Sequence, residues 1–295
     1  MSDTTELARV SGREVRSVRS LGGRHGYRHL DVEFADGQHG FAKVSDRPAA
    51  AGELAAGELA AEANGLRWLG ETGAVPVPDV LGVDETVLVT ALVPAPAGGP
   101  VSQRTAFEFG AGLARMHTYG AGSFGAPWAG YIAGLPLDNT PGSAWPAWYA
   151  ERRLAPFLPI AVSSGALRAQ DGPLVEAVIE RLAANQHPLE LEPPSRIHGD
   201  CWSGNVLWSG GRGWLIDPSA HGGHRETDLA MLALFGAPQL DAIMAGYESV
   251  APLAPGWKSR VPLHQLHPLL VHACLFGASY RAAVVEAARA VLNNC

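Results

Sequence analysis

The sequence predicts an α+β protein with two lobes, a small N-terminal sheet with one main helix and a larger, mostly helical C-terminal part. Strand-like patterns and a single helix fill the first 93 residues, and helical patterns dominate the rest. Between them lies a stretch rich in helix and strand breakers, with Pro94, Pro96, Gly98, Gly99 and Pro100. We therefore expect one lobe over residues 1–93 and a second over residues 94–295.

In the first lobe, short apolar runs alternate with turn signals. Asp36-Gly37 is typical of a tight hairpin turn, and the short run Phe41-Ala42-Lys43-Val44 follows it. A later segment is rich in Ala, Leu and Glu, with its leucines roughly on one face, and predicts the helix. The expected strands cover residues 15–21, 30–34, 41–44, 80–83 and 87–93, and the expected helix covers residues 53–70.

In the second lobe, most segments carry a helical pattern. A Gly/Pro-rich region over residues 124–144 predicts a loop instead, and a Gly210-Gly211 turn separates two short strands. We expect helices over residues 102–117, 145–158 and 173–185, strands over 206–208 and 214–216, and a largely helical remainder over 227–293.

Composition limits the range of partners. The formal net charge of −7 and the lack of a Lys/Arg run argue against nucleic acid. The first twenty residues have no apolar signal-peptide core, and no unbroken apolar run reaches the roughly 18 residues of a membrane helix. Three cysteines fit a reducing compartment better than a disulfide framework. We expect a soluble cytoplasmic protein, and the sequence leaves its oligomeric state open.

Three oxygen-bearing side chains lie close together in the sequence between residues 196 and 228. Asp200 and Asn205 are five residues apart, like the catalytic carboxylate and the metal-binding amide of kinase-type loops. Asp217 follows at the end of a short apolar run. Carboxylate and amide oxygens suit Mg²⁺, and a carboxylate can orient an acceptor hydroxyl. The spacing indicates phosphoryl transfer; the alternative is that Asp200 and Asn205 only cap turns.

Such a site also needs a lysine near the phosphates. Lys43 lies in a predicted strand between apolar neighbours, where a cation requires an anionic partner. Glu62 on the following helix is the preferred partner, ahead of Glu58, because of helix phase. The turn glycines Gly22 and Gly23 could let backbone amides approach phosphates. The sequence has no Walker-type phosphate loop.

A zinc site is the rival interpretation of the same region. His198 and Cys201 are three residues apart, and so are His221 and His224. The histidine pair lies in a Gly-rich loop and the cysteine stands alone, whereas the oxygen-ligand interpretation also accounts for Lys43. We therefore favour the oxygen ligands and expect His198 to brace the segment from Asp200 to Asn205, which we call the catalytic loop.

The motifs resemble those of a known family. The stretches HGDCWSGNVLW, from His198, and LIDPSAHGGHRETDLAM, from Leu215, are similar to the fructosamine kinases (ketosamine 3-kinases). This family is related to the aminoglycoside phosphotransferases and shares the protein-kinase-like fold. Trp202 and the downstream GHRETDLAM are more particular to it than the wider H-G-D…N framework. The resemblance extends through residues 124–145, 151–154 and 264–280.

The resemblance implies roles for the matching residues. Asp200 would be the base that orients the sugar hydroxyl, and Asn205 and Asp217 would bind magnesium. Lys43, held by Glu62, would contact the α and β phosphates of ATP. The remaining assignments concern adenine (Thr90 and Leu92), bracing of the catalytic loop (Asp228) and, by position alone, the acceptor side (Trp202, Asn139, Trp145 and His224).

Three departures from the family pattern stand out. Cys201 occupies a position where leucine is usual, Ser219 one where alanine is common, and the turn GGRHG is less typical, which puts its nucleotide contacts in doubt. Cys201 beside the proposed base raises the hypothesis of redox sensitivity. The simpler interpretation is that it fills a leucine-sized space.

The implied substrate is a ketosamine, such as a ribulosamine or fructosamine adduct, phosphorylated on its 3-hydroxyl with ATP and Mg²⁺. The product is unstable, so the family is associated with deglycation, and the acceptor could be a small molecule or a glycated protein. One alternative is a kinase for another alcohol, aminoglycoside-like or choline-like, against which Trp202 argues. Another is a catalytically inactive kinase-like binding module, against which the joint presence of Lys43, Asp200, Asn205 and Asp217 argues.

Overall fold

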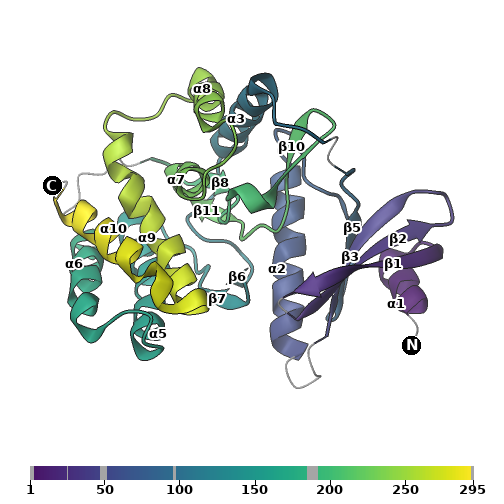
Figure 1. The fold of residues 1–295 in the computed structure, drawn as a ribbon, viewed down its shortest axis with the longest axis horizontal. Coiled ribbons are helices and arrows are strands. Elements are labelled where there is room, and N and C mark those ends of the chain that lie inside the picture. Colours follow the sequence, from purple (N-terminus) through teal and green to yellow (C-terminus); the bar gives the residue numbers. More distant parts are fainter. Residues whose placement is uncertain (1–2, 25, 47–51, 96–97, 185–191, 294–295) are drawn as a thin grey trace.

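The computed structural model has a sheet-containing N-terminal part and a mainly helical C-terminal part (Figure 1). The longest N-terminal helix, α2 (Gly52–Gly70), lies between the sheet and the C-terminal part. This arrangement agrees with the expected α+β fold class. The structure describes residues 3–24, 26–46, 52–95, 98–184 and 192–293 of the 295-residue chain.

Among the described residues, the N-terminal part contains a five-stranded antiparallel sheet with the order β1-β2-β3-β5-β4. Its strands are β1 (Val15–Arg24), β2 (Tyr27–Phe34), β3 (His39–Ser45), β4 (Val80–Val83) and β5 (Val87–Ala91). Successive side chains of a strand face opposite sides of the sheet. Ala42 and Val44 therefore share a core cluster with Leu7 of α1 (Asp3–Ser11), while Lys43 between them reaches toward α2.

The C-terminal part is built mainly of helices that pack on one another around buried apolar side chains. α3 packs along α8, and α9 packs against α7 and α10. Its described helices are α3 (Gln103–Thr118), α4 (Trp145–Tyr149), α5 (Phe157–Ser163), α6 (Gly172–Ala183), α7 (Glu226–Leu234), α8 (Leu240–Val250), α9 (Trp257–Phe276) and α10 (Arg281–Asn293). Short antiparallel pairs join β6 (Gly130–Ile132) to β7 (Leu135–Leu137), β8 (Ser195–Ile197) to β11 (His221–Gly223), and β9 (Val206–Ser209) to β10 (Arg212–Leu215).

Several boundaries differ from the sequence expectation. α1 was not expected, the expected loop over 124–144 contains the β6–β7 hairpin, and β5 ends at Ala91. The helix expected over 145–158 is interrupted by a π-helical turn, in which the Ala155 amide donates to the Ala150 carbonyl, five residues back. Pro156, with no amide hydrogen, follows this turn, so α5 begins as a separate helix. The end of the helix expected over 173–185 lies outside the described residues.

One helical stretch, Trp257–Asn293, is long and apolar enough to cross a membrane by length and composition alone. It consists of α9, a 3₁₀ turn (Gly277–Tyr280) and α10 rather than one continuous helix. Leu266 and Leu270 of α9 are fully buried in the C-terminal core. Core helices of soluble proteins also reach this length and apolar content, so these two properties are weak evidence for a membrane segment.

Candidate active site

Lys43 joins the two parts of the molecule through an ion-pair cluster. Its Nζ lies 2.7 Å and 2.9 Å from the two carboxylate oxygens of Glu62 on α2, and 2.5 Å from Oδ1 of Asp217. Burial alone would lower the pKa of Lys43, but the charges of Glu62 and Asp217 outweigh it and raise that pKa. The lysine therefore remains a cation that can face phosphate oxygens.

The pKa values of the two carboxyl groups beside Lys43, those of Glu62 and Asp217, shift in opposite directions. Burial and the negative charge of Asp217 raise the pKa of Glu62 to about 7, against the opposing effect of Lys43. For Asp217, burial acts to raise the pKa, but the charge and hydrogen bond of Lys43 leave it below the ordinary value. Lys43 thus favours the ionised form of Asp217, the form that could bind a divalent cation.

Close packing of α2 against the C-terminal part brings Glu62 to this cluster. A Cβ atom at Gly65 would lie 3.1 Å from Pro218 and from Ala220, so this helix runs close to the segment that follows Asp217. Asp217 itself has a φ of 52°, a left-handed conformation that aspartate tolerates better than most residues. The Lys43 Nζ contacts both carboxylate oxygens of Glu62, so Glu62 rather than Glu58 is its partner.

Asp200 follows β8 and lies beside Asn205, which directly precedes β9. The Asn205 Nδ2 donates to the Asp200 backbone carbonyl and to its Oδ2, both at 2.9 Å, which leaves the amide oxygen of Asn205 to face a cation. Burial raises the pKa of Asp200 to about 7, with Asn205 opposing it and the charge of Asp217 adding to it. A carboxylate whose pKa lies near 7 is well suited to accept a proton at physiological pH.

A buried network holds the backbone on which Asp200 stands. Asp228 of α7 accepts hydrogen bonds from the amides of His198 (2.7 Å) and Gly199 (3.0 Å) and from Nε2 of His117 (3.1 Å). Burial alone would raise the pKa of Asp228, but the His117 hydrogen bond and nearby histidines lower it. His198 Nε2 donates to the carbonyl of Ile216 at 2.9 Å, which joins this loop to the strand leading to Asp217.

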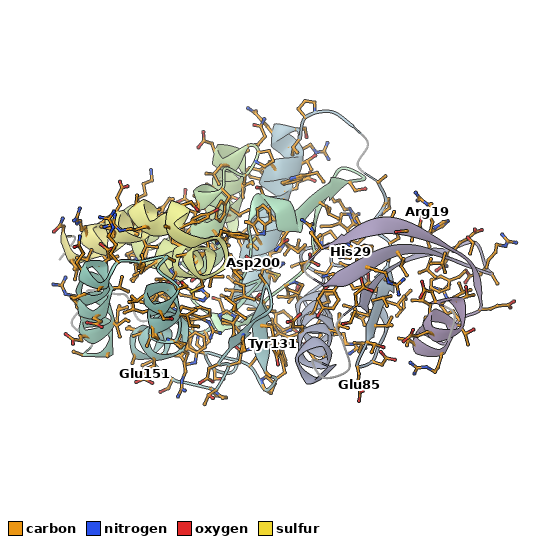
Figure 2. All side chains as sticks on the ribbon, turned by 60° about the horizontal axis from the view of Figure 1, so that its bottom comes forward. Arg19, His29, Glu85, Tyr131, Glu151 and Asp200 are labelled. Carbon is orange, nitrogen blue, oxygen red and sulfur yellow. The ribbon has the colours of Figure 1, made fainter. Side chains whose placement is uncertain are left out.

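These side chains open into a single pocket of about 230 Å³ between the two parts. Figure 2 shows Asp200 and Tyr131 near the middle of the molecule, with His29 on the sheet side. Of the residues expected from the sequence, the structure places six in the pocket lining: Lys43, Glu62, Asp200, Trp202, Asn205 and Asp217. The Trp202 ring lies over Gly204, where any Cβ would overlap it.

The other expected residues lie elsewhere in the described structure. Gly22 and Gly23 are in the end of β1, and Thr90 is buried in β5, all outside the pocket lining. The Leu92 amide donates to the His39 carbonyl at 3.1 Å. On the acceptor side, Asn139, Trp145 and His224 are each less than 5% exposed and outside the pocket lining. Position in the sequence could not reveal that burial.

Sequence reasoning missed several pocket residues. Tyr27 and Tyr131 line it, as do His272 and Phe276 near the end of α9. The only available signals were their aromatic character and, for Tyr131, His272 and Phe276, a place in stretches that resemble the family, and neither signal distinguishes pocket from core.

The structure also bears on the zinc interpretation. Cys201 is fully buried, and burial raises its pKa well above the ordinary value, which disfavours a redox-sensitive thiolate. His198 and His221 each place a ring nitrogen against a backbone carbonyl. These contacts are those of structural residues.

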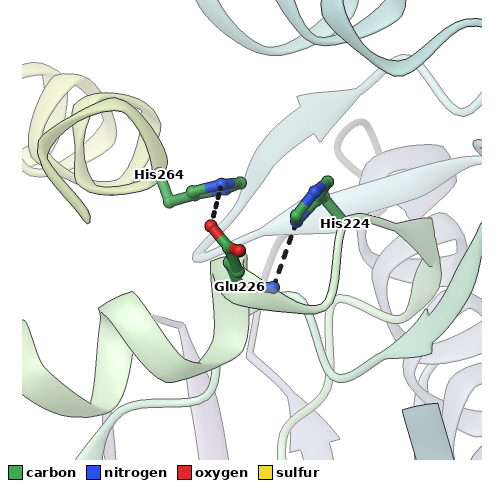
Figure 3. A group of neighbouring side chains, drawn as sticks. All are labelled: His224, Glu226 and His264. Carbon is green, nitrogen blue, oxygen red and sulfur yellow. Dashed lines mark hydrogen bonds and ion pairs between the residues drawn. The ribbon is translucent and has the colours of Figure 1, made fainter. Parts of the chain in front are cut away.

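A separate group of His224, Glu226 and His264 has the residue types of a metal site (Figure 3). The Glu226 carboxylate is already paired with Arg260, whose Nε and Nη2 lie 2.9 Å and 2.5 Å from its oxygens. The Glu226 amide donates to Nδ1 of His224 at 3.2 Å, so a neutral His224 carries its hydrogen on Nε2. We interpret this group as a buried ion pair with flanking neutral histidines.

Comparisons with known proteins agree with this geometry. A family model described as fructosamine kinase matches residues 12–294. A probable ketoamine kinase of Escherichia coli, YniA, is 34% identical over 272 residues, which cover 90% of this chain and 89% of that protein. The crystal structure of a candidate fructosamine-3-kinase from Thermobifida fusca has a TM-score of 0.92 and 50% identity, with 99% of each chain covered.

The fold is also similar to that of a structure with much lower sequence identity. A choline kinase from Streptococcus pneumoniae has a TM-score of 0.63 at 14% identity, covering 98% of this chain and 97% of that one. The expected two-lobed, kinase-like fold is confirmed. The chain belongs to the fructosamine kinase family and is an ATP-dependent phosphotransferase.

Proposed function

We propose that this chain transfers the γ-phosphoryl group of ATP to the 3-hydroxyl of a ketosamine, such as a ribulosamine or fructosamine adduct. The observation that carries the proposal is the joint opening of Lys43, Asp200, Asp217 and Trp202 into one pocket. The first three residues supply the phosphoryl-transfer chemistry. Trp202 belongs to the motif that resembles the fructosamine kinases.

Each residue then has a defined task. Asp200 orients the sugar hydroxyl and accepts its proton as the oxygen attacks the γ-phosphorus; the new O–P bond forms while the bond to the ADP oxygen breaks. Lys43, held by Glu62, faces the α and β phosphates. Asn205 and Asp217 would hold Mg²⁺, which when bound offsets the charge of the phosphate oxygens.

The wider assignments follow from the same proposal. Thr90 and Leu92 would lie near adenine, and the lobe boundary falls after residue 93, between β5 and α3. We place the enzyme in the cytoplasm, where ATP and glycated metabolites meet. Phosphorylation of the 3-hydroxyl would make the adduct unstable and release the amine, so the enzyme would promote deglycation.

An acceptor screen tests the proposal. Purified protein with ATP and Mg²⁺ is given ribulosamine and fructosamine adducts of one small amine, and gentamicin and choline as competing acceptors. We expect ADP release with the ketosamines and a phosphate ester on the sugar 3-oxygen, assigned by ³¹P–¹H NMR. Efficient phosphorylation of gentamicin or choline without ketosamine turnover would overturn the substrate assignment and leave the enzyme class intact.

A further inference from the structure

Past Asp200, the described residues of the pocket form a wall without a charged side chain. Beyond the catalytic loop, the described lining residues are Met231, Pro268, Val271, His272, Leu275 and Phe276. His272 Nδ1 donates to the Pro268 carbonyl at 2.7 Å, and burial lowers the pKa of His272, so its ring is neutral at physiological pH. We call these six residues the α9 wall, since all of them except Met231 belong to α9.

A connected set of rings leads from the catalytic loop to this wall. The Trp202 ring centroid is 6.0 Å from that of Phe235, which is 4.8 Å from that of His272. His272 in turn lies 5.4 Å from Phe276 and 5.0 Å from Tyr280. These separations fall in the range of favourable aromatic contacts. The rings therefore support one another and position Phe276 in the pocket lining.

Phe276 is the exposed member of the set. It is 55% exposed and lies in the pocket lining. A large apolar ring left open to water beside a pocket marks a surface for an apolar ligand group. Asp200 lines the same pocket, so an apolar group on this wall would be within reach of an acceptor bound at Asp200.

We propose that the α9 wall binds the amine-derived part of the acceptor, and that the preferred substrates are ketosamines of small amines with an uncharged apolar or aromatic group. This inference rests on the proposed function. With the sugar hydroxyl at Asp200, the amine end of the adduct extends beyond Trp202. Its protonated nitrogen suits an aromatic face, and its apolar substituent suits the wall.

The same wall disfavours a glycated protein as the substrate. A modified lysine in a protein carries a backbone and neighbouring polar side chains, which need hydrogen-bonding or charged partners when they lose water. The described lining from Met231 to Phe276 contains no Asp, Glu, Lys or Arg. The carboxylates of the pocket, including Asp200 and Asp217, lie instead at the phosphoryl-transfer end.

The test compares adducts that share ribulose and differ only in the amine: methylamine, benzylamine and Nα-acetyl-lysine, with a ribose-glycated protein as a fourth acceptor. We expect kcat/KM for the benzylamine adduct to exceed that of the methylamine adduct about tenfold, equivalent to roughly 1.4 kcal/mol. The lysine adduct should fall between them, and the glycated protein should be the poorest acceptor per modified site.

Matched variants assign the effect to the wall. Phe276→Ala should reduce the benzylamine-to-methylamine ratio to less than threefold, and Phe276→Tyr should retain most of it. Phe107→Ala is the control, because Phe107 is 40% exposed on α3 and outside the pocket lining. Thermal unfolding confirms that each variant is folded.

Two failures can be told apart. If the four ketosamine acceptors react with similar kcat/KM, or if Phe276→Ala leaves the ratio unchanged, the α9 wall does not select the amine and the proposed function stands. If no ketosamine is phosphorylated while another alcohol is, the proposed function itself is wrong. Preferred turnover of the glycated protein would also overturn the inference.

Discussion

Asp200 is the residue on which the proposed reaction depends most directly. Its carboxylate lies 2.9 Å from the Asn205 amide nitrogen and lines the pocket. We predict that Asp200→Asn reduces kcat by about 10²–10⁴-fold, because the amide cannot accept the hydroxyl proton. ADP binding measured by calorimetry should change less than about threefold. Asp241→Asn, at an exposed position of α8, is the control, and full activity in Asp200→Asn would refute the assignment.

The protonation state of the same carboxylate gives a pH prediction. Burial raises the pKa of Asp200 to about 7, and the base must be ionised to accept a proton. Activity should therefore fall as the pH drops through this pKa. Magnesium held by Asn205 and Asp217 would favour the ionised form of Asp200, so we expect an acid limb in kcat/KM with a midpoint at or below about 7. Activity that increases from pH 8 to pH 6 would contradict this.

At the residue scale, sequence reasoning worked where chemistry dictates both residue type and spacing. Lys43, Asp200 and Asp217 line one pocket, as their order and spacing along the chain predict for a phosphoryl-transfer site. It did not work for the acceptor side. Trp145 stacks on Tyr149 and His264 within the core, and a sequence pattern does not distinguish such a ring from one in a pocket.

At the scale of elements, β8 connects the catalytic loop to the helix that carries Glu62. Arg196 of β8 donates to the Trp68 carbonyl (2.5 Å) and to the Glu71 carboxylate (2.8 Å) at the end of α2. Its guanidinium also lies 4.6 Å from the Trp68 ring centroid and 4.5 Å from that of Tyr119. A cation at a helix C-terminus is favourable, so Arg196 holds α2 against the C-terminal part.

We predict that Arg196→Met weakens this connection and displaces Glu62 from Lys43. The KM for ATP should increase about fivefold or more, with a loss of unfolding free energy on the order of 1.5–3 kcal/mol. Arg196→Lys should be intermediate, because lysine keeps the charge but loses the planar fork and the stacking. Arg289→Met, exposed on α10, is the control. Unchanged ATP affinity in Arg196→Met would show that α2 is positioned without this residue.

A second element-scale prediction concerns the crossing of α3 and α8. A Cβ at Gly110 would overlap the backbone carbonyl of Ile243, and one at Gly246 would overlap that of Phe107. The two helices thus touch through their backbones, and backbone atoms cannot rotate away. Gly110→Ala should lower the unfolding free energy by about 1–3 kcal/mol in urea titrations. Gly122→Ala, with no atom within 4 Å of the added carbon, should change it by less than about 1 kcal/mol.

The sequence predicts a helix or strand best when the residues that stabilise it lie within the element itself. The helix expected over 53–70 is α2, because its alanine and leucine content favours helix without help from the rest of the chain. The β8–β11 pair joins residues about twenty-five positions apart, with His221 opposite Ile197, and has only three residues per strand. Such a pairing depends on tertiary contacts, and no periodic pattern in the sequence reports it.

At the scale of the whole molecule, buried charge pairs link helices that are distant in sequence. Glu226 begins α7, close to the catalytic loop, and its partner Arg260 is in α9, whose other end forms the α9 wall. Both side chains are less than 10% exposed. This ion pair therefore couples the catalytic side of the C-terminal part to the proposed acceptor side.

We predict that Glu226→Gln lowers the unfolding free energy at pH 7 by about 3–5 kcal/mol, because it leaves the Arg260 cation buried without a countercharge. Glu108→Gln, which removes the exposed Arg104–Glu108 ion pair, is the control and should change the unfolding free energy by less than about 0.5 kcal/mol. Urea titrations of both variants and the parent protein measure the difference.

The pH dependence of this difference identifies its electrostatic origin. Burial acts to raise the pKa of Glu226, but the Arg260 hydrogen bonds and the neighbouring histidines lower it from 4.5 to about 2. A depressed carboxyl pKa contributes stability that is complete above the unfolded-state value and is lost as the pH falls toward the folded-state value. The gap between parent and Glu226→Gln should therefore be constant from pH 7 to about 5.5 and narrow below about 4.5. A gap that stays constant down to pH 3.5 would mean that Glu226 stabilises the fold through packing rather than through its charge.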